Sequence, residues 1–178
     1  MSRLFGPICQ NGYVVRDIEA AMCHWSDVLG VGPWFYTAHA PIHDFHYRGQ
    51  PSAPDVAIAL ANSGSLQLEL IQQHNDAPSL YRDFVAAGHE GLQHIAYWTE
   101  DFAGERQRAI DLGFRIGHEG VTGRYGPFVY FETTAHPGTI LELSDVGGAK
   151  RKLFQHIRAA ADGWDGRDPV RDFPELAD

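Results

Sequence analysis

Long hydrophobic segments are missing from this sequence. Its longest uninterrupted apolar run is roughly six residues, at positions 56–61, whereas a membrane-spanning helix needs about 20. The first residues, MSRLFGPICQNGY, also lack the apolar core of about 7–15 residues that a signal peptide carries. We therefore expect no membrane partner and a cytoplasmic location.

Positive charge and cysteine are also scarce. Lysine and arginine together number 14 against 23 acidic residues, the net charge is −9, and the lysines are Lys150 and Lys152. Because nucleic acids are bound largely by neutralising phosphates with a basic face, this composition argues against nucleic acid as a partner. Cys9 and Cys23 are too few for a disulfide framework and lack CxxC spacing, so we expect both to be small buried side chains.

The rest of the composition is that of a globular domain. Hydrophobic residues make up 44% and charged residues 21% of the 178 positions, which disfavours disorder. The length is sufficient for one domain, or for two small units that share a core. Histidine, with ten residues, is abundant for a chain of this length.

The first half of the sequence predicts the order β-α-β-β-β. A short strand in residues 8–16 precedes an amphipathic helix that Asp17 opens as N-cap and Gly30 ends. An aromatic strand, GPWFYTAHA, is followed by a segment rich in His, Pro and Gly that we expect to be a loop through Pro54. Strands VAIALA and SLQLELIQ then flank a turn signal, Asn-Ser-Gly, at residues 62–64.

The second half repeats this order about eighty residues later, which indicates an internal duplication. GLQHIAYWT is expected to be a strand, the helix DFAGERQRAIDLG again opens with an Asp and ends with a Gly, and three strands follow. We therefore divide the chain into a first βαβββ module (1–75), a helical linker (76–90), a second βαβββ module (91–146), and a C-terminal helix and tail (147–178).

Four polar residues occupy corresponding places in the two halves. Gln10 and His94 each stand seven residues before the Asp that opens the helix, and Glu69 and Glu142 each lie between leucines on the last strand. Alternation along a strand places each Glu on the face opposite its leucines. A carboxylate that faces a core is costly unless it is paired or binds a metal, and one metal between the halves would account for both. The alternative is that the glutamates face solvent and His94 is an ordinary core residue.

With these residues the chain resembles the vicinal oxygen chelate superfamily: glyoxalase I, methylmalonyl-CoA epimerase, extradiol dioxygenases and bleomycin-resistance proteins. The resemblance covers residues 8–146 and is carried by QNGYVVRDIEAAMCHWSDVLGVGP, GLQHIAYWTEDF and PGTILELSD, with the linker SLYRDFVAAGHEGLQHIA similar to that of the epimerases. It implies an α+β fold of two paired βαβββ modules, curled into an eight-stranded cup around one metal site, and a homodimer. It also implies a ligand set, found in some glyoxalases: Gln10, Glu69, His94 and Glu142. The epimerases usually have His where this chain has Gln10.

The implied ligands predict the kind of chemistry. One imidazole, two carboxylates and one amide suit Zn, Ni, Co or Mn, and leave two positions of an octahedral ion open. Such an ion polarises a carbonyl and stabilises an enolate or enediolate, while a base moves the proton on the adjacent carbon. By resemblance to glyoxalases that base is Glu142. We therefore expect an isomerase, epimerase or lyase that acts on a small carbonyl or thioester substrate.

The sequence is compatible with two other functions. One is a metal-free protein that sequesters an aromatic compound, and the other is an extradiol-type dioxygenase, although its iron sites use two histidines and one carboxylate. The many aromatic residues favour an apolar or ring-bearing substrate, but the sequence does not identify the residues that bind it. Further candidates lie in polar segments of both halves: His43, Asp44, His46, Asp55, Arg124 and Tyr125.

Overall fold

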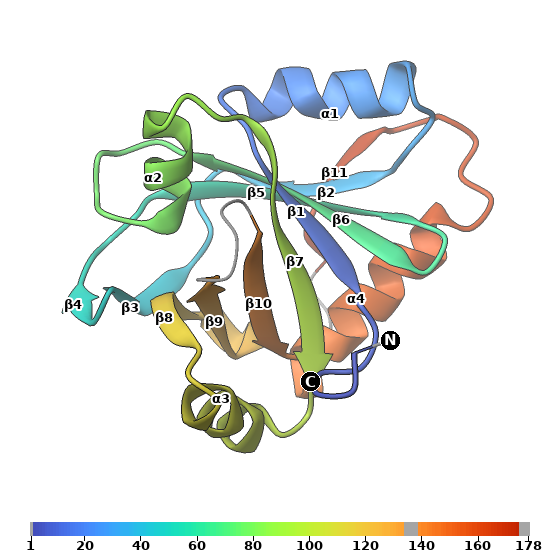
Figure 1. Cartoon of the computed structure of the whole chain (residues 1–178). Coiled ribbons are helices and arrows are strands. Elements are labelled where there is room, and N and C mark those ends of the chain that lie inside the picture. Colours follow the sequence, from blue (N-terminus) through green and yellow to red (C-terminus); the bar gives the residue numbers. More distant parts are fainter. Residues whose placement is uncertain (1, 134–138, 175–178) are drawn as a thin grey trace.

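The computed structural model of the chain describes residues 2–133 and 139–174 (Figure 1). Its helices are α1 (Ile18–Asp27), α2 (Leu80–Ala86), α3 (Phe102–Asp111), α4 (Gly148–Ala161) and the 3₁₀ helix η1 (Gly123–Tyr125). Its strands are β1 (Gln10–Val14), β2 (Trp34–Thr37), β3 (Ile42–Tyr47), β4 (Gln50–Pro51), β5 (Val56–Ser63), β6 (Leu66–Gln73), β7 (Gly91–Thr99), β8 (Arg115–Thr122), β9 (Pro127–Glu132), β10 (Ile140–Asp145) and β11 (Val170–Asp172).

Two equivalent groups of four strands form the centre of one mixed sheet. In the first group β1 pairs in parallel with β6, which continues to β5 and β2; in the second, β7 pairs in parallel with β10, which continues to β9 and β8. The groups join where β1 and β7 run antiparallel. The predicted α+β fold of paired βαβββ modules is thus confirmed.

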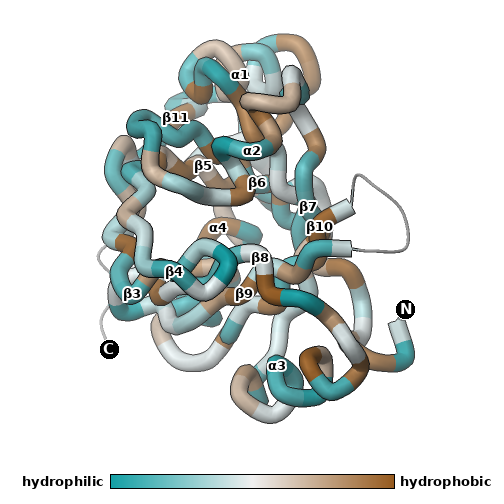
Figure 2. The backbone as a smooth tube through the Cα atoms, turned by 60° about the vertical axis from the view of Figure 1, so that its left-hand side comes forward, coloured by the Kyte–Doolittle hydropathy of each residue, from teal (hydrophilic) through white to brown (hydrophobic). Residues whose placement is uncertain are grey.

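The sheet is longer than eight strands because three further strands extend its ends. Within the described residues it has eleven strands, with β11 beside β2 at one end and β3 and β4 beside β8 at the other. The expectation of a loop through Pro54 was therefore wrong. Strand β3 joins the edge of β8 through main-chain hydrogen bonds, which need no alternating hydrophobic pattern, and its His43 and Asp44 are exposed while Phe45 is buried. Figure 2 shows this largely hydrophilic hairpin beside β8.

A short connection shows how strongly the sheet curls. Strand β2 ends at Thr37 near one end of the strand order, and β3 begins at Ile42 near the other end. The five Cα–Cα steps from Thr37 to Ile42 span at most about 18 Å, so these two ends of the sheet must lie close together. The sheet is therefore a nearly closed cup.

The outer face of the cup carries the hydrophobic cores under α1 and α3. Leu68 and Leu70 of β6 pack with Ile18 and Met22 of α1, and Leu143 of β10 packs in the cluster that includes α3. Figure 1 shows the two helices at opposite ends of the molecule. Because successive strand residues point to opposite faces, the glutamates between these leucines point into the cup.

The helix starts agree with the sequence. Asp17 accepts a hydrogen bond from the Ala20 amide at the start of α1, and Asp101 accepts one from the Gly104 amide at the start of α3. The cysteine expectation was wrong: Cys9 is half-buried and Cys23 is exposed. Cys23 follows Met22 on α1 and so lies off the stripe that the helix buries.

The C-terminal segment closes one side of the cup. Leu153 and Ile157 of α4 pack against Phe35 of β2 and Leu60 of β5. Strand β11 then pairs in parallel with β2. Of the predicted tail, residues 175–178 lie outside the described part of the chain. Among the described residues, none of the helices has both the length and the hydropathy that crossing a bilayer requires.

Candidate metal centre and substrate pocket

Adjacent strands bring the predicted ligands together in two neighbouring rows across the cup. Glu69 of β6 and His94 of β7 both pair with Gly12 of β1, which lies between them. In the next row Gln10 of β1 and Glu142 of β10 both pair with Ala96 of β7. The duplication predicted from the sequence therefore places all four side chains on one face of four neighbouring strands.

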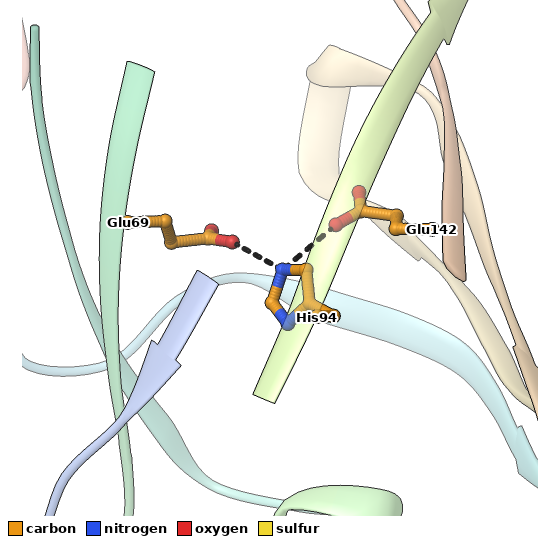
Figure 3. A group of neighbouring side chains, drawn as sticks. All are labelled: Glu69, His94 and Glu142. Atoms are coloured by element: carbon orange, nitrogen blue, oxygen red, sulfur yellow. Dashed lines mark ion pairs between the residues drawn. The ribbon is translucent and has the colours of Figure 1, made fainter. Parts of the chain in front are cut away.

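Three of the four side chains converge on a point, as Figure 3 shows. His94 Nε2 lies 3.3 Å from Glu69 Oε2 and 3.2 Å from Glu142 Oε2. One ligand atom from each residue lies within 4.8 Å of the others, and all three residues are buried. This spacing is close enough for a single cation to bind all three.

The His94 ring is held with one nitrogen facing the glutamates. Its Nδ1 lies 2.8 Å from Gln93 Oε1, and the Gln93 amide nitrogen donates to the Leu80 carbonyl of α2 at 3.2 Å. In this arrangement Nδ1 carries the proton when the ring is neutral, which leaves the Nε2 lone pair for a metal. Metal-bound histidines are commonly fixed in this way by a hydrogen bond from the other ring nitrogen.

Gly12 provides the space for this ring. A Cβ atom at position 12 would lie 1.7 Å from His94 Cε1 and 1.9 Å from Nε2. Any larger residue would therefore displace the imidazole or the strand. The sequence offers a sign of this role, because Gly12 follows Gln10 by two positions and therefore lies on the same face of β1, where a glycine allows close approach of a neighbouring group.

Gln10 lies beside the three-residue group. Its amide nitrogen donates to Gln67 Oε1 at 2.8 Å, so its own Oε1 is the atom free to serve as a ligand. Gln10 also lines the same cavity as the two glutamates. Its role as fourth ligand stays a prediction.

The electrostatics of the three-residue group also suit a cation. Burial alone would lower the pKa of His94, but the two glutamates raise it to about 9. Burial raises the pKa of Glu69. Burial would also raise the pKa of Glu142, but His94 outweighs it and the pKa lies below its ordinary value. Glu142 Oε2 is fully buried and faces His94 Nε2 at 3.2 Å, so a divalent ion that displaces the His94 proton would take over this contact.

These pKa directions predict that metal affinity rises with pH. A metal binds neutral imidazole, so it must displace the proton that His94 holds below pH 9. Affinity for Zn²⁺ should then rise about tenfold per pH unit between pH 7 and 9. Calorimetric titrations in buffers of different ionisation enthalpy would measure both this slope and the proton released; an affinity that does not change over this range would contradict the assignment.

Without metal, the same shift acts on stability in the opposite direction. The pKa of His94 in the folded protein lies above its ordinary value of 6.5. Its stabilising contribution is therefore complete below about pH 6.5 and is lost as pH rises through about 9. The loss is on the order of 3 kcal/mol, and denaturant unfolding of metal-free protein would show it.

A cavity of about 400 Å³ opens above this group. Apolar residues of β5 and α4 form much of its wall, and the segment that joins β2 to β3 contributes Ala40 and Pro41. Gln10, Glu69 and Glu142 form its polar floor. The remaining residues of the cavity lining are Tyr36, Thr37, Ile42, Ile58, Leu60, Tyr81, Thr122, Tyr125, Phe128, Tyr130, Ser144, Lys150, Leu153, Phe154, Asp172 and Phe173.

Lys150 is a wall residue that the sequence analysis did not single out as functional. It lies in the first turn of α4, is 5% exposed, and donates from Nζ to Ser144 Oγ at 2.7 Å. Burial lowers the pKa of Lys150, against the opposing charges of Glu142, Asp145 and Glu69. A lysine within a pattern of basic helix residues gives no sign in the sequence of which way it points.

The remaining candidates are placed away from the centre, with one exception. His43 and Asp44 are exposed and hydrogen-bond each other, and His46 contacts the Asp44 carbonyl. Asp55 is paired with His39. None of these four lines the cavity within the described part of the chain, and neither does Arg124. Tyr125, in η1, does line it.

Comparison with known proteins agrees with this architecture. The sequence profile of the Glyoxalase/Bleomycin resistance protein/Dioxygenase superfamily matches residues 9–131, more than half of the chain. The chain therefore belongs to this superfamily. A search of curated protein sequences finds no match.

Several solved structures of methylmalonyl-CoA epimerases have a similar fold. One selenomethionine structure shares 17% identity at a TM-score of 0.56, over 83% of this chain and all of the other. The enzyme from Mycobacterium tuberculosis shares 16% identity at a TM-score of 0.57, over 85% of this chain and 95% of the other. The Streptomyces coelicolor enzyme in complex with 2-nitronate-propionyl-CoA shares 19% identity at a TM-score of 0.51, over 78% of this chain and 93% of the other. At these identities the likeness concerns the fold.

Proposed function

We propose that this chain is a divalent-metal-dependent enzyme that moves a proton on the carbon next to a carbonyl group, as an isomerase, epimerase or lyase. The observation that carries the proposal is the buried convergence of Glu69, His94 and Glu142, of which the two carboxylates line a cavity. Gln10 completes the proposed ligand set from the adjacent row. A metal in this set would polarise the substrate carbonyl and stabilise negative charge on its oxygen.

The residues of the chain supply the other requirements of this reaction. Glu142 is the proposed base, because it is a carboxylate that lines the cavity and its lowered pKa keeps it ionised at neutral pH. Tyr130 stands beside it, with its hydroxyl oxygen 3.3 Å from His94 Nε2. The apolar walls exclude water from the reacting carbon and orient an apolar or aromatic substrate.

A binding protein that sequesters an aromatic compound is the second candidate. The apolar cavity favours it, since such walls also suit simple capture. Against it, a protein that only sequesters an apolar compound needs no buried carboxylates on the cavity floor. A dioxygenase is less well supported, because the converging group contains one histidine and two carboxylates.

Metal content distinguishes these candidates. Protein purified without chelators or a histidine tag should hold about one equivalent of Zn, Ni, Co or Mn per chain, or bind one when it is added back. His94→Ala should lose it, with affinity lower by about 100-fold or more, whereas His43→Ala, at an exposed position of β3, should bind as the parent does. Elemental analysis and calorimetry would measure both. Iron would favour the dioxygenase, and no metal under any condition would leave the binding protein.

The reaction itself is tested by proton exchange. Metal-loaded protein should exchange the α-hydrogen of an enolisable substrate with deuterium from D₂O, which NMR detects without knowledge of the final product. Ketones and thioesters with apolar or aromatic groups form the first panel. Coenzyme A thioesters belong in it, because the similar Streptomyces coelicolor epimerase was solved with a coenzyme A compound. Dimer formation stays a prediction that sedimentation can test.

A further inference from the structure

Lys150 occupies a position that the local structure disfavours twice. It stands in the first turn of α4, where the helix dipole opposes a positive charge, and it is 5% exposed although lysine is rarely buried. Lys152, two residues on, is exposed. A residue that breaks local preferences in this way is expected where function requires it.

The Lys150 ammonium has hydrogen-bonding capacity that the protein does not use. Of its three N–H donors, one is directed to Ser144 Oγ in the contacts among described residues. Ser144 lies two residues after Glu142 on β10 and so shares its face of the sheet. Lys150 and Ser144 therefore line the same cavity as the proposed base, one side-chain row, or about 7 Å, along the strand.

Lys150 is also not required to balance the charge of the proposed metal site. The two glutamates would neutralise a divalent ion, with His94 and Gln10 neutral, and Lys150 then adds one positive charge. Asp145 attracts Lys150 electrostatically and accepts a hydrogen bond from the Gly147 amide, and Asp172 is an exposed residue of the cavity lining. A buried ammonium is costly unless its charge and its N–H donors are satisfied, and a bound anion would satisfy both.

We propose that Lys150 binds a carboxylate of the substrate, so that the substrate class is a carbonyl compound with a nearby carboxylate and an apolar or aromatic body. This inference rests on the proposed function, since it concerns the same pocket. The carboxylate lies against Lys150 and Ser144, while the carbonyl lies over the glutamates. The apolar remainder contacts Leu153 and Phe154 of α4 and Ile58 of β5.

A matched pair of probes tests the assignment. Benzoylformate and benzoylformamide have the same aromatic ketone and nearly the same shape, but only the first is anionic. Metal-loaded protein should bind benzoylformate more tightly by about 10- to 100-fold, the range expected for a hydrogen bond to a charged group. Lys150→Met should abolish this preference, Lys150→Arg should keep part of it, and Lys152→Met, the exposed control, should keep all of it.

Each outcome decides the proposal. If the parent protein shows no preference, if the preference survives in Lys150→Met, or if benzoylformate does not bind at millimolar concentration, the proposal is overturned. Metal binding, measured separately, reports on the proposed function. If no metal binds, that function fails, and the same probes on metal-free protein still show whether an acid preference depends on Lys150. Thermal unfolding of Lys150→Met adds a control. Loss of a lysine that only supports the fold would lower Tm, whereas loss of a lysine that is held for a ligand would not.

Discussion

Glu142→Gln should reduce α-hydrogen exchange by a factor on the order of 10³ while the fold and a bound metal remain. The amide keeps the shape of the side chain and an oxygen that can coordinate, but it cannot accept the proton. General-base catalysis contributes about 10²–10⁴ to rates, so the loss should be close to complete. Deuterium exchange under saturating metal measures it.

The matched control is Glu69→Gln, which changes the equivalent residue of the first module. Each of the two variants loses one carboxylate charge, so both should bind metal more weakly. Once metal is saturating, however, Glu69→Gln should retain more exchange than Glu142→Gln, because Glu69 acts only as a ligand in the proposed mechanism. Equal exchange in the parent and Glu142→Gln proteins would remove Glu142 from the role of base. Equal loss in the two variants would mean that the ligand set, and not one base, was affected.

Gly12→Ala should lower metal affinity by about 100-fold or more without touching any proposed ligand. The added Cβ would occupy the space of the His94 ring, at 1.7 Å from Cε1, so the imidazole must leave its position between the glutamates. Overpacking of this kind also costs about 1–3 kcal/mol of stability. Calorimetric titration and denaturant unfolding measure the two effects.

A double-mutant cycle makes this test specific. In a His94→Ala background the ring is gone, so Gly12→Ala should cost little further stability. Strong coupling between the two positions is the expected result. Additive costs would mean that Gly12 acts on the strand itself and not through His94.

Sequence reasoning succeeded where a repeated pattern restricted the answer. The two Asp residues that cap α1 and α3 fixed the register of each module, and from it the positions of Gln10 and His94 on β1 and β7. The leucines beside each Glu fixed which face the carboxylate takes, because they pack under α1 and α3. These features are local and occur twice, which is why they are readable.

Features that depend on distant contacts were not readable. Strand β3 forms because the edge of β8 offers main-chain partners, and nothing in the polar segment around His43 specifies that edge. The wall formed by α4 was missed for a related reason. Its amphipathic pattern shows that one face is buried, but not that this face covers the cavity, and Lys150 lies on it.

The pairing of β3 with β8 has a consequence for how the chain acquires its structure. Ile42 meets Thr122, about eighty residues later, so the edge that completes the cup belongs to a part of the chain synthesised afterwards. During synthesis, the edge of β3 that pairs with β8 has no partner strand until β8 has left the ribosome. The pocket wall at Ile42 and Thr122 therefore cannot be complete before most of the second module has been synthesised.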